Sequence, residues 1–329
     1  MTTINLGNAL DFATYGNYAP PAAAYRREGG IARLVYPIDG RITGDGSAGY
    51  PETPGRYHLY VSHSCPWAER PLIALKLRGL EHAVTWSAVD PVRDGRGWAF
   101  RDGDGYGADP VNDFAFLREA YLATQPDFDG HISVPALWDR ESGRLVSNHY
   151  PSLTVDLETR FAEWADPNID LYPPALRADI ESLNDEIIRD LSGAAHAARA
   201  AATQEQYHTV SDRAFAALAR YDQRLGDWRY LHGNTITDSD ILLYVTLVRF
   251  DLVTAVVGRL HYRRLVDYPH LWAYARDLHQ EPAFRSATNF DHIRRGTFHT
   301  AAGAPARIVP RAPDCDWDAP TDRTTSSTR

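Results

Sequence analysis

Apolar positions fall in short runs through the first half of the chain and recur at helical spacing in the second half. Residues 57–61, YHLYV, predict a strand, and the segment after them predicts a turn and a helix ending at Gly79. Residues 83–90 alternate as a strand does, and two short runs at 134–139 and 144–147, joined by RESG, predict a β-hairpin. The first half is therefore predicted to fold as strand, helix, strand and hairpin.

Between the second strand and the hairpin lies an insertion, residues 91–133, which is longer than usual loops and carries one helical stretch at 113–123. We expect a functional loop there. After Glu158 no strand pattern recurs, and apolar residues follow helical spacing at 176–191, 210–225, 239–257 and 271–278. The second half is therefore predicted to be a helical bundle.

These patterns predict four segments. Residues 1–56 are rich in Gly, Pro, Ala and Tyr without sustained periodicity, which is typical of an extended arm with few regular elements. Residues 57–164 form an α+β domain that includes the insertion, and residues 165–290 form an all-helical domain. Residues 291–329 form a C-terminal extension, whose polar end from Asp314 is predicted to be mobile.

Composition and charge narrow the classes of function. The 329 residues are 44% hydrophobic and 23% charged, which excludes a disordered chain and leaves room for two packed domains. The net charge of −9 and the scattered arginines argue against a nucleic-acid binder. The start of the chain has no signal-peptide pattern, and the longest apolar run, 241–248, is far shorter than the ~20 residues that span a bilayer. We therefore expect a cytoplasmic protein, away from membranes, that acts on small molecules or protein.

The two cysteines are 250 positions apart and cannot build a disulfide framework, and no CxxC pair or Cys/His cluster predicts a metal site. Cys65 follows the first strand and precedes Pro66, a residue type favoured at the first helical position. Its sulfur is thus predicted to lie at a helix N-terminus, where the dipole and backbone N–H groups lower a thiol pKa from about 8.5 toward neutrality. We expect Cys65 to be a nucleophile, and the alternative is a buried small hydrophobe. Cys315 lies between two acidic residues in the tail and is expected to be a bystander.

Four blocks of the sequence share motifs with one known family: YVSHSCPWAERPLIALKLRGLE, SVPALWDRESGRLVSN, YLHGNTITDSDILLYVTLVRFD, and FDHIRR with IVPRAP. They run from about residue 57 to residue 313 and resemble the glutathionyl-hydroquinone reductases, the Xi class of glutathione transferases. The resemblance implies a thioredoxin-like N-terminal domain, an all-helical C-terminal domain and a homodimer. It also implies that a cysteine attacks the sulfur of a glutathionyl-hydroquinone, that the hydroquinone leaves, and that a second thiol releases the mixed disulfide.

Six positions of the thiol site match the family: Cys65, Pro66, Trp67, Trp98, Val134 and Pro135. The resemblance makes Cys65 the nucleophile, with the next two residues completing its motif, and packs Trp98 on the bound thiol. It also implies a cis bond before Pro135, so that the Val134 backbone pairs with the cysteine moiety of the thiol. The sequence pattern alone favours an ordinary trans proline there.

Other recognition positions depart from the family. Its SNES motif reads here Ser147, Asn148, His149 and Tyr150, and His131 stands where an arginine commonly precedes the TVP run. These changes remove the acid that pairs with the γ-glutamyl ammonium of glutathione and the serine that binds its carboxylate. Each charge-assisted bond is worth on the order of 1–3 kcal/mol, so these losses predict much weaker glutathione binding.

Two low-molecular-weight thiols therefore remain open. Glutathione fits if a nearby arginine such as Arg70 compensates for the lost anchors. Mycothiol, an acetylated cysteine on an aminoglycan-inositol head, has no such ammonium or carboxylates and suits hydroxyl-binding partners such as Asn148, His149 and Tyr150. The 33 arginines against a single lysine also fit GC-rich, mycothiol-using actinobacteria. We therefore prefer mycothiol as the thiol, and we expect no metal.

The predicted electrophile site departs from the family as well. Ala195 stands where a quinone-contacting tyrosine is usual, and Thr297 and Phe298 replace two aromatic hydroxyls. Arg249 and Phe250 are retained and are candidates for this site, although helix packing explains them equally well. The favoured function is a thiol-dependent reductase or transferase acting on an aromatic or quinone-type conjugate. The alternatives are glutaredoxin-like removal of a small thiol from proteins and a non-catalytic binding protein of the same fold.

Overall fold

The structure, a computed structural model, describes residues 5–28, 31–299, 307–321 and 323. Backbone contacts divide the chain into two compact units, each formed from two segments. Unit one comprises Met1–Ile169 and Asp291–Pro310, and unit two comprises Asp170–Phe290 and Arg311–Arg329. The C-terminal extension is thus shared between the units, and the four segments delimited from the sequence stay a prediction.

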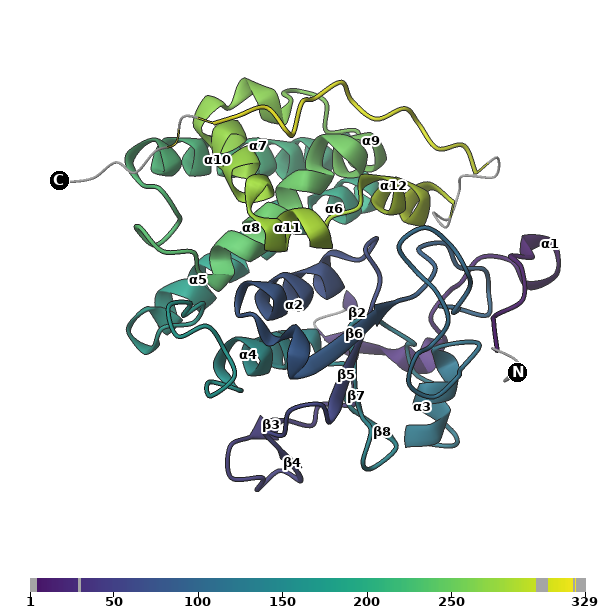
Figure 1. The fold of residues 1–329 in the computed structure, drawn as a ribbon. Helices are drawn as coiled ribbons and strands as arrows, with labels where there is room; N and C mark the ends of the chain where they lie inside the picture. Colours follow the sequence, from purple (N-terminus) through teal and green to yellow (C-terminus); the bar gives the residue numbers. More distant parts are fainter. Residues whose placement is uncertain (1–4, 29–30, 300–306, 322, 324–329) are drawn as a thin grey trace. The chain divides into compact units, whose positions relative to one another are not determined.

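Unit one is built on a four-stranded sheet with the strand order β6-β5-β7-β8 (Figure 1). The strands are β5 (Tyr57–Val61), β6 (Val84–Ala88), β7 (Ala136–Asp139) and β8 (Arg144–Ser147). Strand β5 pairs parallel with β6 and antiparallel with β7, and β7 pairs antiparallel with β8. All five residues of β5 are buried, as expected for a central strand.

Beyond the N-terminal arm, the described helices of unit one are α2 (Pro66–Leu77), η2 (Leu80–His82), α3 (Arg118–Thr124), α4 (Tyr150–Thr159) and most of α12 (Phe290–Phe298). Parallel strands need a crossover connection, and α2 makes the crossover between β5 and β6. Because α2 begins directly after Cys65, the helix that the topology requires also fixes the position of this sulfur.

The helix predicted at 113–123 begins only at Arg118 in the structure. The Glu119 carboxylate accepts hydrogen bonds from the backbone N–H groups of Ala115 and Phe116, at 3.0 and 2.9 Å. This local side-chain bonding takes the place of the first helical turns.

The N-terminal arm has more regular structure than expected. Its elements are α1 (Phe12–Tyr15), η1 (Ala22–Ala24), β1 (Tyr25–Glu28), β2 (Ile31–Leu34), β3 (Ile42–Thr43) and β4 (Tyr50–Pro51). Strand β1 pairs antiparallel with β2, and β3 pairs parallel with β4. These elements are too short to leave a periodic pattern in the sequence.

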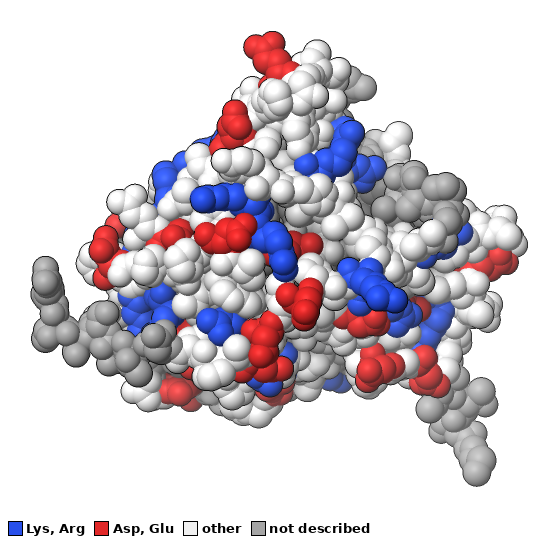
Figure 2. Space-filling view, turned by 90° about the horizontal axis from the view of Figure 1, so that it is seen from above, with Lys and Arg blue, Asp and Glu red and all other residues white. Residues whose placement is uncertain are grey.

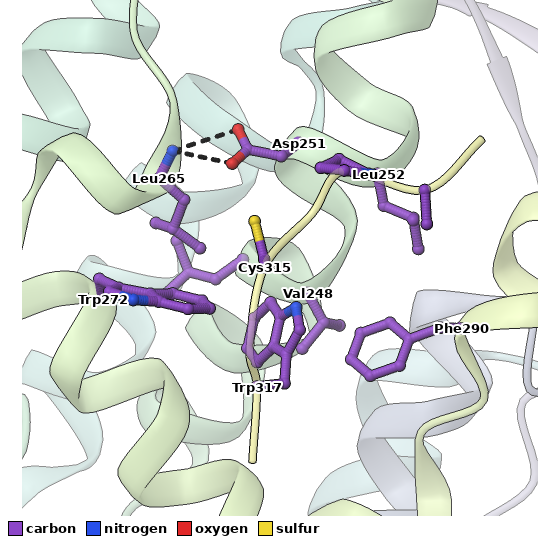
Figure 3. Close-up of a pocket in the computed structure, with 11 residues that line it drawn as sticks. Val248, Asp251, Leu252, Leu265, Trp272, Phe290, Cys315 and Trp317 are labelled. Carbon is purple, nitrogen blue, oxygen red and sulfur yellow. Dashed lines mark hydrogen bonds between the residues drawn. The ribbon is translucent and has the colours of Figure 1, made fainter. Parts of the chain in front are cut away.

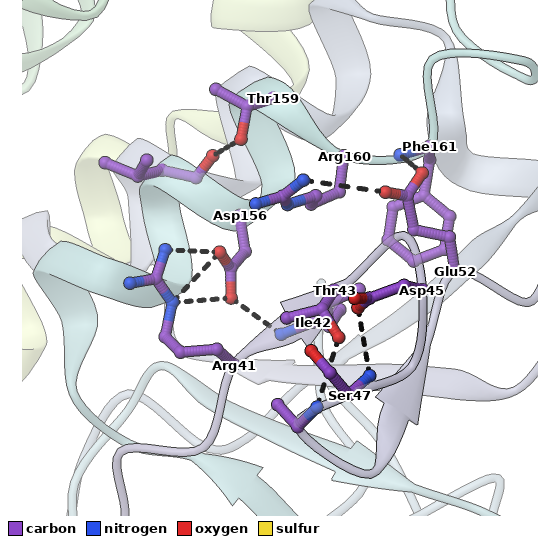
Figure 4. A network of polar contacts seen from close by, with 12 residues as sticks. Arg41, Ile42, Thr43, Asp45, Ser47, Glu52, Asp156, Thr159, Arg160 and Phe161 are labelled. Carbon is purple, nitrogen blue, oxygen red and sulfur yellow. Dashed lines mark hydrogen bonds and ion pairs between the residues drawn. The ribbon is translucent and has the colours of Figure 1, made fainter.

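Polar contacts tie the arm to α4 (Figure 4). The buried Asp156 carboxylate accepts hydrogen bonds from the Arg41 guanidinium, at 2.6 Å from Nη2 to Oδ1, and from the backbone N–H of Ile42 at 2.9 Å. The Glu52 carboxylate accepts a hydrogen bond from the N–H of Phe161 at 2.7 Å. Each bond joins residues more than 100 positions apart, which no local pattern predicts.

Unit two is all helical, as predicted. Its elements are η3 (Pro174–Leu176), α5 (Arg177–Ile187), η4 (Ile188–Ser192), α6 (Ala194–Ala200), α7 (Gln204–Asp227), α8 (Asp238–Arg249), η5 (Phe250–Thr254), α9 (Ala255–Gly258), η6 (Leu265–Asp267), α10 (Pro269–Gln280) and α11 (Pro282–Ala287). The stretch Asp238–Gly258 is apolar and long enough to cross a membrane, but 78% of the apolar window is buried inside the structure. Such burial is typical of the core helix of a bundle.

The C-terminal tail packs on unit two as far as it is described. The Trp317 ring meets the Trp272 ring edge-on, with 4.8 Å between the ring centroids, and lies 5.3 Å from the Phe290 ring. Trp317 lies within the end of the chain that the sequence predicts to be mobile from Asp314, so part of that end has packing contacts. Its last part, residues 324–329, lies outside the described residues.

Charged groups are mixed on the surface. Over the face shown in Figure 2, basic and acidic side chains are interspersed, and neither kind gathers into one extended patch. Several arginines are held in ion pairs, such as Arg41 with Asp156 and Arg56 with Asp139. A mixed face of this kind creates no extended field that attracts a polyanion.

Candidate functional site

Cys65 lies in a tight loop between β5 and α2. It is the N-cap residue of α2, with φ −94° and ψ 117°, and its backbone N–H donates to the carbonyl of Ser62 at 3.0 Å. Pro66 takes the first helical position, where no N–H partner is needed. The sulfur is therefore attached to the residue at which the helix dipole and the first N–H groups favour negative charge.

The Cys65 sulfur lies 3.5 Å from the carbonyl oxygen of Val134. The Val134–Pro135 peptide bond is cis, so the trans bond favoured by the sequence pattern alone is wrong and the one implied by the family resemblance is present. Pro135 directly precedes β7. A backbone segment thus borders the sulfur, which is the kind of edge with which a peptide-like molecule pairs.

Aromatic side chains gather near this sulfur. Trp67, in the first turn of α2, stacks on Tyr150 with 4.7 Å between ring centroids. Tyr36 of the arm meets Tyr150 edge-on at 5.5 Å. Burial raises the pKa of both tyrosines, and the charge of Cys65 adds to the rise, so both phenols stay protonated beside it.

His131 is neutral in this site. Its Nδ1 lies 3.0 Å from the hydroxyl of Tyr18, which also accepts a hydrogen bond from the N–H of Ile132 at 3.0 Å. Burial lowers the pKa of His131 to about 4, and the positive charge of Arg93 adds to the shift. His131 therefore does not replace, as a cation, the arginine that the family commonly has at this position.

Arg93, in the insertion, supplies a positive charge nearby. Its guanidinium lies over the ring of Tyr18 at 4.4 Å and over the ring of Trp98 at 4.2 Å. Burial lowers the pKa of Arg93, while the charges of Tyr18 and Cys65 raise it. Trp98 is only 5% exposed, and its indole N–H has no acceptor among the described residues. A cation and an indole donor thus stand together within electrostatic reach of Cys65.

Two family models match the sequence that forms these elements. The model described as glutathione S-transferase, N-terminal domain, matches residues 64–149, which contain Cys65 and the cis proline. The model described as glutathione S-transferase, C-terminal domain, matches residues 196–277 of unit two. The N-terminal model thus matches part of unit one, and the C-terminal model matches part of unit two.

The glutathionyl-hydroquinone reductase YqjG of Escherichia coli K12 is 36% identical over 301 residues, 91% of this chain and 92% of YqjG. The chain belongs to the glutathionyl-hydroquinone reductase family of glutathione transferases. PcpF of Sphingobium chlorophenolicum, another glutathionyl-hydroquinone reductase, is 31% identical over 267 residues, 81% of this chain and 85% of PcpF.

Solved structures agree with this membership. The glutathione-bound structure of YqjG matches with a TM-score of 0.83 at 37% identity and covers 87% of this chain and 96% of that one. The Xi-class glutathione transferase of Natrialba magadii matches with a TM-score of 0.82 at 37% identity, over 87% of this chain and 88% of that one. The family, the fold class and the enzyme class predicted from the sequence are thereby confirmed.

Ser147 and Asn148 of this reductase family member hold the arm. The Ser147 hydroxyl donates to the carbonyl of Ile38 at 3.2 Å and accepts from the N–H of His149 at 3.1 Å. The Asn148 side chain is fully buried, accepts from the N–H of Ile38 at 3.2 Å and donates to the Ser133 hydroxyl at 3.3 Å. The structure thus gives both side chains partners within the protein, and their role in thiol binding stays a prediction.

His149 takes the place of the family's acidic residue. It is the N-cap residue of α4, and its Nδ1 lies 2.8 Å from the Ser152 hydroxyl. Arg70, on α2, is 5% exposed, and its charge partly offsets the raised pKa of Tyr150. This corner of the site therefore presents an imidazole, a guanidinium and a phenol, where a γ-glutamyl ammonium would need a carboxylate.

Helix α12, from the far end of the chain, packs onto the Cys65 loop within unit one. A Cβ atom at Gly296 would lie 2.4 Å from the Cβ and 2.8 Å from the Oγ of Ser64, so the approach requires glycine. The ring of His292 lies 5.6 Å from that of His63, and its Nε2 lies 2.8 Å from the carbonyl of Asp104. The FDHIRR block belongs to the family resemblance, but its sequence does not predict this contact with the Cys65 loop.

The two electrophile-site candidates lie in unit two. Phe250 is fully buried at the start of the wide turn η5 and meets Phe215 edge-on at 6.1 Å. Arg249 ends α8, is 6% exposed and donates from Nη1 to the carbonyl of Val245 at 2.8 Å. Both are part of the helical core, and a role at the electrophile site stays a prediction.

A separate cavity of about 160 Å³ lies within unit two, between helices and the tail (Figure 3). Its wall is mostly apolar and includes Trp272 and Trp317. Cys315 lines it, with Arg264 Nη2 at 3.0 Å from the sulfur. Burial raises the pKa of Cys315, and the charge of Asp251 adds to the rise. The surroundings of Cys315 thus disfavour its thiolate.

Three residues of the Cys65 neighbourhood escaped the sequence analysis: Tyr18, Tyr36 and Arg93. The tyrosines lie in the arm, where the sequence shows only a general richness in tyrosine. Arg93 lies five residues before Trp98, in a stretch that gave no reason to single it out. Among the described residues, no group of three or more His, Cys, Asp or Glu side chains could hold a metal ion.

Proposed function

We propose that the protein is a thiol-dependent reductase in which Cys65 attacks the sulfur of a glutathionyl-hydroquinone-type conjugate. The observation that carries the proposal is the position of this cysteine, at the N-cap of α2 with its sulfur 3.5 Å from the Val134 carbonyl. The similar proteins YqjG and PcpF are glutathionyl-hydroquinone reductases.

The proposed reaction has two steps. The Cys65 thiolate attacks the sulfur of the conjugate, the carbon–sulfur bond breaks, and the aryl carbon takes up a proton, which releases the hydroquinone. Cys65 is left in a mixed disulfide with the small thiol. A second small thiol attacks this disulfide, regenerates Cys65 and leaves as the oxidised dimer. The two electrons that reduce the aryl carbon thus come from two thiols, one of them delivered in the conjugate.

The same proposal assigns roles around Cys65. The Val134 backbone pairs with the cysteine moiety of the thiol, and Trp98 packs against the bound thiol. Trp67 and Tyr150, stacked on each other beside the sulfur, exclude water from one side of the mixed disulfide. Pro66 sets the first turn of α2 and with it the direction of the sulfur.

For the small thiol we propose glutathione, in place of the mycothiol preferred from the sequence, which becomes the second candidate. The glutathione-bound structure of YqjG and the cation of Arg93 near Cys65 support a thiol with carboxylates. The imidazole at His149, in place of an acid, supports a thiol without the γ-glutamyl ammonium, such as mycothiol.

The intact mass of the protein tests both proposals. After incubation with one equivalent of a glutathionyl-hydroquinone, we expect a mass increase of one glutathione on Cys65 and an equal amount of released hydroquinone. Parallel incubation with oxidised glutathione and with oxidised mycothiol reports which thiol forms the adduct. A glutathionylated protein as substrate separates this reductase from a glutaredoxin-like enzyme. Hydroquinone release without any adduct on Cys65 would refute the proposed mechanism.

We further propose that the protein is a homodimer in the cytoplasm. The dimer is what the family resemblance implies, and light scattering coupled to gel filtration measures it directly. The cytoplasm keeps small thiols reduced, which the second step of the proposed reaction requires. A monomer at micromolar concentration would refute the proposed homodimer and would leave the proposed reaction of Cys65 unaffected.

A further inference from the structure

Two neighbouring N–H groups near Cys65 have no acceptor among the described residues: Arg93 Nη1 and Trp98 Nε1. Their side chains are in contact, with the guanidinium carbon 4.2 Å from the indole centroid. Both atoms are buried, and a buried donor without an acceptor costs on the order of 1–3 kcal/mol, and more when it is charged. Two such donors side by side indicate a place that is built to receive an acceptor.

Arg93 differs from two other arginines of the insertion, Arg96 and Arg101, in having no carboxylate partner among the described residues. Arg96 pairs with Asp94 at 2.6 Å, and Arg101 pairs with Asp90 at 2.9 Å. Within the described residues, Arg93 forms no ion pair, and its guanidinium lies over the rings of Tyr18 and Trp98. Ring contacts use the flat face of a guanidinium and leave the N–H groups at its edge for an acceptor in the same plane.

We infer that Arg93 and Trp98 form a carboxylate subsite of the thiol site, so that the thiol used by Cys65 carries a carboxylate. The inference rests on the proposed function and names the chemical class of its thiol. A guanidinium binds a carboxylate through two parallel N–H···O bonds, and the indole N–H adds a third donor.

The position of the subsite fits the departures of this chain from its family. Tyr18 contacts the Arg93 guanidinium with its ring and bonds His131 with its hydroxyl. The cation therefore lies one side chain away from position 131, where the family commonly has an arginine. Because His131 is neutral, Arg93 is the residue of this pair that offers a positive charge.

The subsite also sets specificity between the two candidate thiols. Glutathione has two carboxylates, either of which matches the donors of Arg93 and Trp98. Mycothiol has none, so binding it would leave the Arg93 N–H groups without an anionic acceptor in a partly buried site. We expect glutathione to bind at least tenfold more tightly than mycothiol.

Calorimetric titration of the full chain with glutathione, its glycine monoethyl ester and its diethyl ester tests the subsite. For the unmodified protein we expect esterification of the contacted carboxylate to weaken binding about tenfold, and the monoester shows which carboxylate is contacted. Arg93→Gln is expected to weaken glutathione binding about tenfold and to bind glutathione and the diester equally. Arg93→Lys, which keeps the charge, should restore part of the difference.

Arg118→Gln is the matched control. Arg118 is an exposed arginine whose charge also reaches Tyr18, and its replacement should leave the ratio of the two affinities unchanged. The subsite is refuted if the unmodified protein binds glutathione and its diester equally, or if Arg93→Gln weakens both by the same factor. The titrations measure binding and require no turnover, so they test the subsite even if the protein releases no hydroquinone. If the protein does release hydroquinone but esterification has no effect on binding, the subsite is refuted and the proposed reaction stands.

Discussion

Cys65 and Cys315 are the same side chain in two different surroundings. Cys65 caps a 12-residue helix and lies against a backbone carbonyl of unit one. Cys315 lies in an extended tail, with Arg264 at 3.0 Å and with Asp251 raising its pKa together with burial. A cation within contact distance is therefore present at Cys315, the residue that we do not expect to react.

A single nearby cation is not enough to make a thiol reactive. Half of the Arg264 side chain is exposed, so water screens its charge, and a nearby carboxylate opposes it. The N-terminus of α2 instead presents several oriented backbone dipoles to the sulfur at no cost in side-chain entropy. The reactivity that we propose for Cys65 thus rests on the backbone geometry.

The largest expected effect is on turnover. Cys65→Ser should lower the rate of hydroquinone release by about 10³-fold or more, because it removes the nucleophile. Cys315→Ser should leave the rate within about twofold of the original. Steady-state release of hydroquinone, measured by chromatography, checks both, and similar losses in the two variants would break the distinction between the cysteines.

The next effect is on the stability of the tail around Cys315. Trp317→Ala removes the ring that packs on Trp272 and should lower the free energy of unfolding by about 2–3 kcal/mol. Exposure of Cys315 to thiol reagents should rise while the reactivity of Cys65 stays unchanged. Chemical denaturation and mass spectrometry measure the two quantities. Trp228→Ala, at a tryptophan that is 54% exposed, is the control.

A third effect concerns His58, in the strand that leads to Cys65. His58 is fully buried, its ring nitrogens lie 2.7 and 2.8 Å from the hydroxyls of Thr85 and Ser87, and burial lowers its pKa to about 3. As pH falls below 6.5, the unfolded chain binds a proton that the folded protein refuses until about pH 3. Stability from this group is therefore complete above pH 6.5 and is lost progressively below it.

His58→Gln should remove this dependence. Between pH 7 and pH 5 the original protein should lose about 2 kcal/mol more of its free energy of unfolding than the variant does. Urea denaturation at each pH measures it. His261→Gln replaces an exposed histidine of unit two and should follow the original protein. Equal slopes for His58→Gln and the original protein would contradict the buried, neutral state of His58.

The smallest expected effect is the difference in alkylation rate between the two cysteines. At pH 7, iodoacetamide should alkylate Cys65, in a Cys315→Ser background, about tenfold faster than it alkylates Cys315 in a Cys65→Ser background. The rate at Cys315 should still be rising above pH 9, because burial raises the pKa of that thiol. Peptide mass spectrometry follows each site, and equal rates at pH 7 would show that the helix N-terminus does not activate Cys65.

Local signals were enough to place Cys65. A buried apolar strand, a serine-rich turn and Pro66 predict a helix N-cap at this cysteine without any tertiary contact, and the structure has it there. The hairpin of β7 and β8 and the helices of unit two follow equally from period and from turn residues. Such features depend on neighbours within a few positions, which is why one sequence suffices to predict them.

Tertiary structure decided what surrounds the sulfur. Tyr18 and Tyr36 come from an arm without periodicity, Arg93 from a long insertion, and α12 from a segment more than 220 positions after Cys65. The same contacts engage Ser147 and Asn148 with the arm, although their place in the motif predicted thiol binding. Sequence alone thus determined the helix N-cap position of Cys65 and the fold that holds it. Only tertiary structure could place the charges and donors around it, because Coulomb forces and hydrogen bonds depend on distance in space and not on separation along the chain.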